Sequence, residues 1–171
     1  MGARMAGVGL LYEGWERINS RVLDRLSRIS DEELRLVGAD DWPVWALIAH
    51  LAGARVYWLC GVFKEPGAET TPFPDPFGAG WEDHLDVPRG AAELRFAVES
   101  SWRIVESCLA GWTLDSLSQA FQRERQGQLQ QHTRASVLAR LTTHDAFHCG
   151  EVSLILGMNG RQSLDPWGAT G

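Results

Sequence analysis

The stretch RASVLARLTTHDAFHCGEVSLIL, residues 134–156, decides the fold of this chain because its apolar residues recur at helical spacing over about six turns. We predict one long helix here, ended by Gly157. His144 and His148 stand four residues apart, so on a helix they project within about 40° of each other, one turn apart. Relative to Leu141, both fall on the apolar face. The otherwise apolar, inward-facing side of this predicted helix therefore carries a pair of histidines.

This pair indicates a metal site. Two imidazoles at this spacing can reach one ion at about 2.0–2.1 Å, and a buried imidazole needs a partner for each ring nitrogen. His50 is the natural third ligand, because it stands at the edge of the apolar face of an earlier helix, beside the small residues Ala46 and Gly53. The sequence therefore predicts His50, His144 and His148 as metal ligands.

The alternative interpretation is that these are core or boundary histidines, hydrogen-bonded to the backbone or to carboxylates. Two further histidines receive no ligand assignment. His84 lies in a proline-rich segment, and we expect His132 at the surface near the start of the last helix. Asp145 falls inside the buried arc of its helix, so its carboxylate requires a partner.

Three further amphipathic segments accompany the last helix. We expect them over about residues 8–29, from about 41 to just before 66, and over 91–110. A capping signal at Ser30 and Glu33 ends the first of them. Residues 64–90 hold five prolines and four glycines, so they form a long crossover loop. We predict an all-α four-helix bundle in one domain, 1–171, with the loop between helices two and three.

Three smaller features of the chain carry weaker signals. The Gln-rich residues 121–130 favour at most a small hairpin around Gly127. We expect the tail over 164–167 to lay Trp167 back on the bundle. In the loop, Phe73, Phe77 and Trp81 either line a substrate pocket or pin the loop to the helices.

Composition excludes several classes of protein. The chain has 171 residues, of which 44% are hydrophobic and 22% charged, as in globular domains. With a net charge of −6 and no concentrated basic stretch, we expect neither a nucleic-acid partner nor a membrane. Three widely spaced cysteines and the absence of a secretory pattern favour reduced thiols and a cytoplasmic location. We expect Cys60 and Cys108 in the core and Cys149 packed or facing solvent.

Two segments and the tail resemble a known family. The stretches Trp42 to Ala52, WPVWALIAHLA, and Thr143 to Val152, THDAFHCGEV, are similar to the second and last helices of the DinB-like superfamily, also called the DNA-damage-inducible or bacillithiol-transferase-like fold. The resemblance implies a four-helix bundle with a divalent metal on His50, His144 and His148. It also implies frequent homodimers, a stress-response setting and, where members have an assigned activity, reactions of low-molecular-weight thiols such as S-transfer and isomerisation.

The sequence departs from the family after the last histidine. The family often shows Arg-Gly-Gln there, whereas this chain has Cys149-Gly150-Glu151. Gly150 would preserve a close helix contact, while the missing arginine removes a fixed cation. Glu151 is the candidate catalytic residue, either as a proton acceptor or as a partner that supports the ligands.

Three neutral imidazoles leave coordination positions for water or substrate. Nitrogen ligation favours Zn or Ni, with Fe or Mn as further candidates. The leading hypothesis is a metal-dependent thiol S-transferase acting on a small molecule with a small thiol cosubstrate. The alternatives are a metal-dependent hydrolase on the same site and a non-catalytic bundle that binds a metal or ligand.

Overall fold

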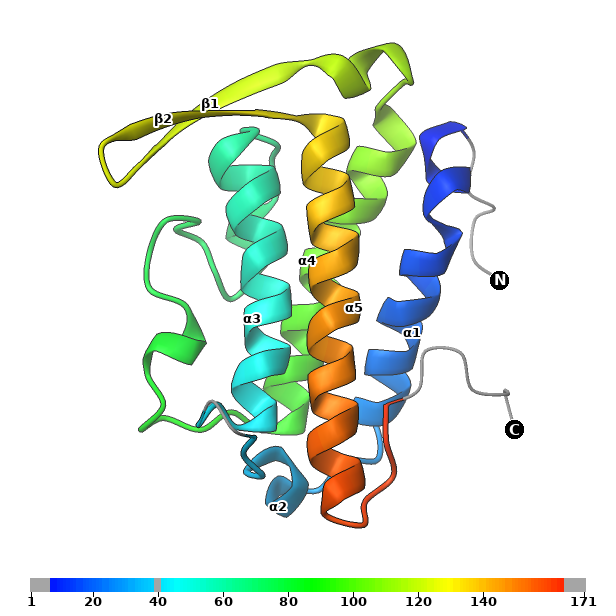
Figure 1. The fold of residues 1–171 in the computed structure, drawn as a ribbon, viewed down its shortest axis with the longest axis vertical. Helices are drawn as coiled ribbons and strands as arrows, with labels where there is room; N and C mark the ends of the chain where they lie inside the picture. The colour runs from blue at the N-terminus through cyan, green and yellow to red at the C-terminus, as the bar shows by residue number, and fades with distance from the viewer. Residues whose placement is uncertain (1–6, 39–40, 165–171) are drawn as a thin grey trace.

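The computed structural model describes residues 7–38 and 41–164 and shows a mainly helical chain (Figure 1). Its elements are a 3-10 turn Gly7–Tyr12, α1 Glu13–Leu26, α2 Asp31–Leu34, α3 Val44–Val56 with a π-helical continuation Tyr57–Val62, 3-10 turns Ala68–Thr70 and Trp81–Asp83, α4 Ala91–Gly111, a 3-10 turn Asp115–Ser118, β1 Ala120–Arg125, β2 Gln128–Thr133 and α5 Arg134–Met158.

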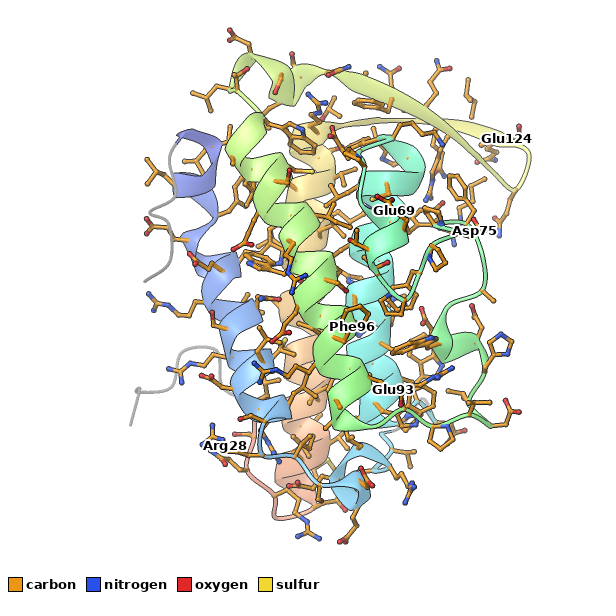
Figure 2. All side chains as sticks on the ribbon, turned by 180° about the vertical axis from the view of Figure 1, so that it is seen from behind. Arg28, Glu69, Asp75, Glu93, Phe96 and Glu124 are labelled. Atoms are coloured by element: carbon orange, nitrogen blue, oxygen red, sulfur yellow. The ribbon has the colours of Figure 1, made fainter. Side chains whose placement is uncertain are left out.

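The long helices α1, α3, α4 and α5 lie side by side and share one core (Figure 1). The apolar positions that defined the predicted helices are buried there, and Trp15, Leu94 and Leu141 have no exposed surface. Charged side chains such as Arg28, Glu69 and Glu124 lie on the outside (Figure 2). The amphipathic pattern therefore places the core correctly, because burying the apolar stripes is what holds such helices together.

The first helix begins later than its pattern predicted. Residues Gly7–Tyr12 form a 3-10 turn, and α1 starts only at Glu13. A 3-10 turn has about 3.0 residues per turn instead of 3.6, so the helical spacing shifts out of phase. Leu11, expected on the apolar face, is consequently 68% exposed.

The predicted capping signal is confirmed, and it starts α2. The Ser30 Oγ atom accepts a hydrogen bond from the Glu33 backbone N–H at 3.2 Å, and the Glu33 carboxylate accepts one from the Ser30 N–H at 2.8 Å. Together these bonds satisfy two N–H groups that have no partner inside the helix.

The fold is mainly helical, and the small hairpin considered around Gly127 is present, because β1 and β2 form an antiparallel pair. Gln126 and Gly127 join the strands with φ values of 53° and 73°. Two left-handed residues in a two-residue loop match the twist of a hairpin, and glycine adopts this conformation at little cost. The strands were hard to predict because they are rich in Gln and Arg and contain few β-branched or aromatic residues. The hairpin extends across the end of α3, above the long loop (Figure 1).

The segment Val44–Val62 is long and apolar enough, by length and composition, to cross a membrane. However, 78% of its most apolar window is buried inside the protein, which is the pattern of a core helix. It packs against both α4 and α5.

The loop over 64–90 has the irregular backbone that was expected, with two short 3-10 turns, and it lies beside α3 (Figure 1). Phe73 is buried, and a Cβ atom on Gly53 of α3 would lie 3.9 Å from its ring, so Phe73 packs the loop against that helix. Phe73 also lines a cavity, so it fills both of the roles considered for the loop aromatics. Phe77 is 58% exposed. Leu164 is buried, whereas the expected packing of Trp167 lies outside the described residues.

Candidate metal centre

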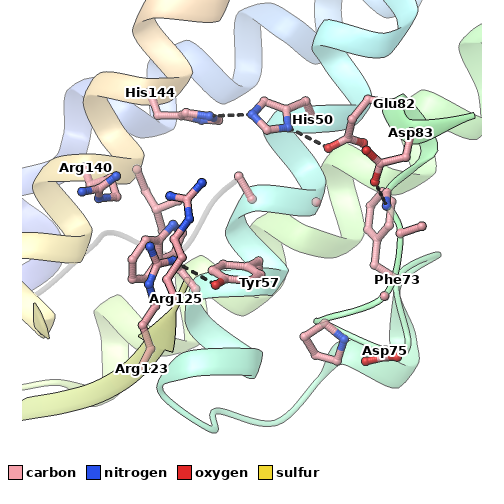
Figure 3. A pocket seen from close by; sticks show the side chains of 18 residues that line it. His50, Tyr57, Phe73, Asp75, Glu82, Asp83, Arg123, Arg125, Arg140 and His144 are labelled. Atoms are coloured by element: carbon pink, nitrogen blue, oxygen red, sulfur yellow. Dashed lines mark hydrogen bonds and ion pairs between the residues drawn. The ribbon is translucent and has the colours of Figure 1, made fainter. Parts of the chain in front are cut away.

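The structure brings the three predicted histidines together. His50 projects from α3, and His144 and His148 project from successive turns of α5. One nitrogen from each ring lies within 4.8 Å of the others, and the Nε2 atoms of His50 and His144 are 3.0 Å apart (Figure 3). The i, i+4 spacing on α5 places His144 and His148 together, whereas His50 reaches them only because α3 packs against α5.

Two carboxylates hold the outer nitrogens of this cluster. His50 Nδ1 lies 2.7 Å from Glu82 Oε1, and His148 Nδ1 lies 2.5 Å from Glu151 Oε2. Because an ionised carboxylate only accepts hydrogen bonds, each Nδ1 carries the proton and each Nε2 presents a lone pair. Such carboxylate partners commonly fix the orientation of metal-binding histidines and raise their basicity.

His144 completes the same arrangement. Its Nδ1 is buried without a hydrogen-bond partner and lies 3.7 Å from Asp145 Oδ1, which is also buried and unpartnered. If Nδ1 carries the proton, it faces the carboxylate, and Nε2 is left bare opposite the bare Nε2 of His50. Two lone pairs 3.0 Å apart repel each other, and a cation between them removes the repulsion.

The spacing of the nitrogens is near what one bound ion requires. Nitrogens bound to one ion at about 2.1 Å are at most about 4.2 Å apart, a limit that the His50–His144 distance already meets. The widest separation in the cluster exceeds that limit by about 0.6 Å at most. The residues present therefore fit a divalent metal bound through imidazole nitrogens.

Beneath the cluster lies a fully buried ion pair. Asp145 Oδ2 accepts hydrogen bonds from Trp15 Nε1 at 2.6 Å and from Arg55 Nε and Nη2 at 3.0 and 2.6 Å. Arg55 also donates to Asn19 Oδ1 at 2.9 Å and lies over the ring of Trp102. Arg55 is thus the partner that the buried Asp145 required, although nothing in the sequence indicated which cation it would be.

The pKa values of two groups on α5, His148 and Asp145, are both shifted by their surroundings. Burial and the neighbouring His144 and His50 lower the pKa of His148, against the opposing effect of Glu151. The ring is therefore held in the neutral form that a metal ligand requires. Burial alone would raise the pKa of Asp145, but the Arg55 guanidinium and the donated hydrogen bonds lower it instead. Asp145 is accordingly held as a carboxylate.

The cluster opens on two cavities. One, of about 490 Å³, is lined by His50 and His144 together with the long loop and the hairpin (Figure 3). The other, of about 400 Å³, is mostly apolar and is lined by His148, Glu151 and residues that include Trp42 and Phe147. Molecules the size of small metabolites can thus approach the imidazoles from either side.

Several expectations about single residues are corrected or completed. Glu151 contacts His148, one of the predicted ligands. Gly150 is exposed, and a Cβ atom there would meet nothing within 4 Å, so it makes no close helix contact. His84 is exposed, whereas His132 is half-buried against the ring of Trp58 at 4.8 Å.

The cysteines are buried, as was expected of Cys60 and Cys108. Burial raises the pKa of Cys60 to about 11 and those of Cys108 and Cys149 to about 12. Cys149 is therefore packed in the core, and it is neither exposed nor a thiolate at neutral pH.

Glu82 was missed by sequence reasoning. It lies in the long loop, 32 residues from His50, and no local spacing connects the two. The only available signal was the general tendency of long loops in compact domains to carry functional residues.

The fold and the cluster define a class of protein, a mainly helical domain with three histidines gathered between two of its helices. The chain belongs to the DinB superfamily, whose family model matches residues 15–152. Its fold is similar to the crystal structure of a DinB-like protein from Bacillus cereus ATCC 10987, with a TM-score of 0.68 and 15% sequence identity over 98% of this chain and 100% of that one. No curated protein matches the chain.

Proposed function

We propose that this protein is a divalent-metal-dependent enzyme that transfers a low-molecular-weight thiol to a small electrophilic molecule. His50, His144 and His148 would hold the ion, with Zn or Ni as the favoured metals. The observation that carries the proposal is the convergence of three imidazoles, two of which have Nδ1 bound to a carboxylate. An ion held by only three protein ligands would keep a coordination position open for a substrate, unlike the ion of a closed structural site.

A bound divalent ion would lower the pKa of a thiol placed beside it and so favour the nucleophilic thiolate at neutral pH. The residues of the chain would prepare the site for that chemistry. Glu82 and Glu151 would fix the orientation of His50 and His148, while the Asp145–Arg55 pair would hold the turn of α5 that carries His144. The 490 Å³ cavity would admit the small substrate.

Glu151 has two possible roles in this proposal. As a positioning residue it would act only through His148; as a proton acceptor it would act on substrate in the second cavity, which it lines. Glu151→Gln keeps the size of the side chain and removes its charge. A variant with wild-type metal content but an altered pH–rate profile supports proton transfer, whereas loss of metal alone supports positioning. Full activity with full metal content excludes both.

The first test is the metal content of protein purified without an affinity tag, measured by elemental mass spectrometry. We expect close to one ion per chain in the wild type and little in His148→Ala. His84→Ala is the matched control, because His84 is exposed and is not one of the three clustered histidines. The metal content of this variant should equal that of the wild type. Wild-type protein that contains no metal and takes up neither Zn nor Ni would refute the proposal.

The second test separates the reactions. The metal-loaded protein is assayed for conjugation of small thiols to haloalkyl and epoxide electrophiles, beside hydrolysis of ester and amide substrates. Thiol-dependent turnover that His148→Ala abolishes supports S-transfer. Hydrolysis without thiol would favour the hydrolase alternative, which uses the same histidines. Strong stabilisation by metal with no turnover would favour a non-catalytic metal-binding bundle.

A further inference from the structure

Three arginines line the same cavity as His50 and His144. Arg123 and Arg125 alternate along β1, so their side chains leave the same face of the strand. Arg140 lies on α5 one turn before His144. Figure 3 shows these arginines, here called the arginine wall, on one side of the cavity, with Glu82, Asp83 and Asp75 on the other.

Neutral groups hold two members of the arginine wall, Arg123 and Arg140. Arg123 donates to Gln130 Oε1 at 2.9 and 3.1 Å and to the Tyr57 hydroxyl at 2.9 Å. The Trp58 ring lies 4.4 Å from the Arg123 guanidinium and 5.1 Å from that of Arg140. Within residues 7–38 and 41–164, no member of the wall forms an ion pair with a carboxylate. Arg123 and Arg140 are thus oriented by uncharged partners, and their guanidinium groups are left without a direct carboxylate contact among the described residues.

The carboxylates on the other side of the cavity are engaged locally, and their hydrogen bonds are made on that side (Figure 3). Glu82 binds His50. Asp83 accepts a hydrogen bond from the Gly80 N–H at 2.7 Å, and Asp75 accepts one from the Phe77 N–H at 3.0 Å. These bonds stabilise the turns of the loop and direct the carboxylates into it.

The charges of Arg123 and Arg140 also act on a neighbouring histidine. Burial lowers the pKa of His132, and the charges of Arg123 and Arg140 lower it further. A cavity with one uncompensated cationic wall and a low-dielectric aromatic lining concentrates anions. Arginine, with its planar fork of donors, is particularly suited to carboxylate.

We propose that the substrate of this site carries a carboxylate, which Arg123, Arg125 and Arg140 bind while its reactive end points toward His50 and His144. This inference rests on the proposed function for the reactive end only. Recognition of the acid requires neither metal nor turnover.

The test is isothermal titration of metal-free protein with 3-phenylpropionate and with its neutral amide, 3-phenylpropanamide. We expect the acid to bind at least about tenfold more tightly than the amide, which corresponds to about 1.4 kcal/mol. The double variant Arg125→Gln/Arg140→Gln should reduce this preference, because Arg123 is then the one remaining cation of the wall. Arg103→Gln, on an exposed position of α4, is the matched charge control and should retain it. Thermal unfolding of each variant checks that the fold is intact.

The outcomes are distinguishable from those of the metal and turnover tests. Equal affinity for acid and amide, or a preference that is undiminished in the folded double variant, would overturn the inference. Tighter binding of phenyl phosphate than of phenylpropionate would overturn the assignment to carboxylate. If turnover fails while the charge preference is present and depends on the arginines, the proposed function is wrong and carboxylate recognition stands. Arg125→Lys/Arg140→Lys should recover part of the preference, because it restores charge without the fork.

Discussion

Replacement of Asp145 by Asn tests whether the buried ion pair beneath the histidines stabilises the fold. Asp145 and Arg55 have side-chain exposures of 0% and 1%, and Asp145 Oδ2 accepts three hydrogen bonds. Asn keeps the size of the side chain and one acceptor oxygen, so it removes mainly the negative charge. The Arg55 guanidinium is then left buried without a counter-charge.

The magnitude follows from that geometry. Removing one partner of a buried pair costs about 3–5 kcal/mol, because the remaining charge is uncompensated. The amide oxygen of Asn still accepts a hydrogen bond, so we expect the lower end, about 3 kcal/mol. That is a large share of the roughly 5–15 kcal/mol by which native domains are stable. At about 2–4 °C per kcal/mol for a chain of this size, the midpoint of thermal unfolding should fall by about 6–12 °C.

The assay is urea unfolding of wild type, Asp145→Asn, Arg55→Met and the double variant. The summed losses of unfolding free energy in the two single variants should exceed the loss in the double variant by at least about 1.5 kcal/mol, because the double variant leaves neither charge without its partner. Glu32→Gln is the control, since it breaks the exposed Glu32–Arg161 pair and should cost less than about 1 kcal/mol. A loss below about 1 kcal/mol for Asp145→Asn, or strict additivity in the cycle, would refute the reasoning.

Three further predictions follow from the site. Glu82→Gln should weaken Zn binding about 10- to 100-fold in a competitive chelator titration, because the carboxylate no longer fixes the His50 tautomer. Since the pKa of His148 is lowered in the folded state, the stability of metal-free protein and its uptake of Zn should be complete above about pH 6.5 and fall as the pH drops through the lower folded-state pKa. Cys108 and Cys149, with pKa values of about 12, should resist alkylation by iodoacetamide in native protein and react after unfolding, as mass spectrometry would record.

Each of these has a contrary result. Unchanged Zn affinity in folded Glu82→Gln would show that the loop carboxylate does not orient the ligand. A stability that rises as the pH falls from 7 to 5 would have the wrong sign for a histidine held neutral. Rapid alkylation of Cys149 in native protein would contradict its burial.

Local pattern predicted the helices and the inward-facing histidines because both depend on residues three to four positions apart. The capping box at Ser30 and the pair on α5 are of this kind, and each was located from adjacent sequence alone. The 3-10 start before Glu13 and the Gln-rich hairpin were less accessible, because their periodicity is weak or differs from that of an α-helix.

The sequence by itself thus determined the mainly helical class, the apolar stripes that form the core, and the two histidines that share one face of α5. Only the tertiary structure decided which partners they meet. Arg55 is 90 residues from Asp145, and Glu82 is 32 residues from His50. The arginine wall joins a hairpin to α5 across one cavity. Such contacts arise because packing apolar faces brings distant segments together, and the polar groups at their edges then form ion pairs and hydrogen bonds that no local spacing encodes.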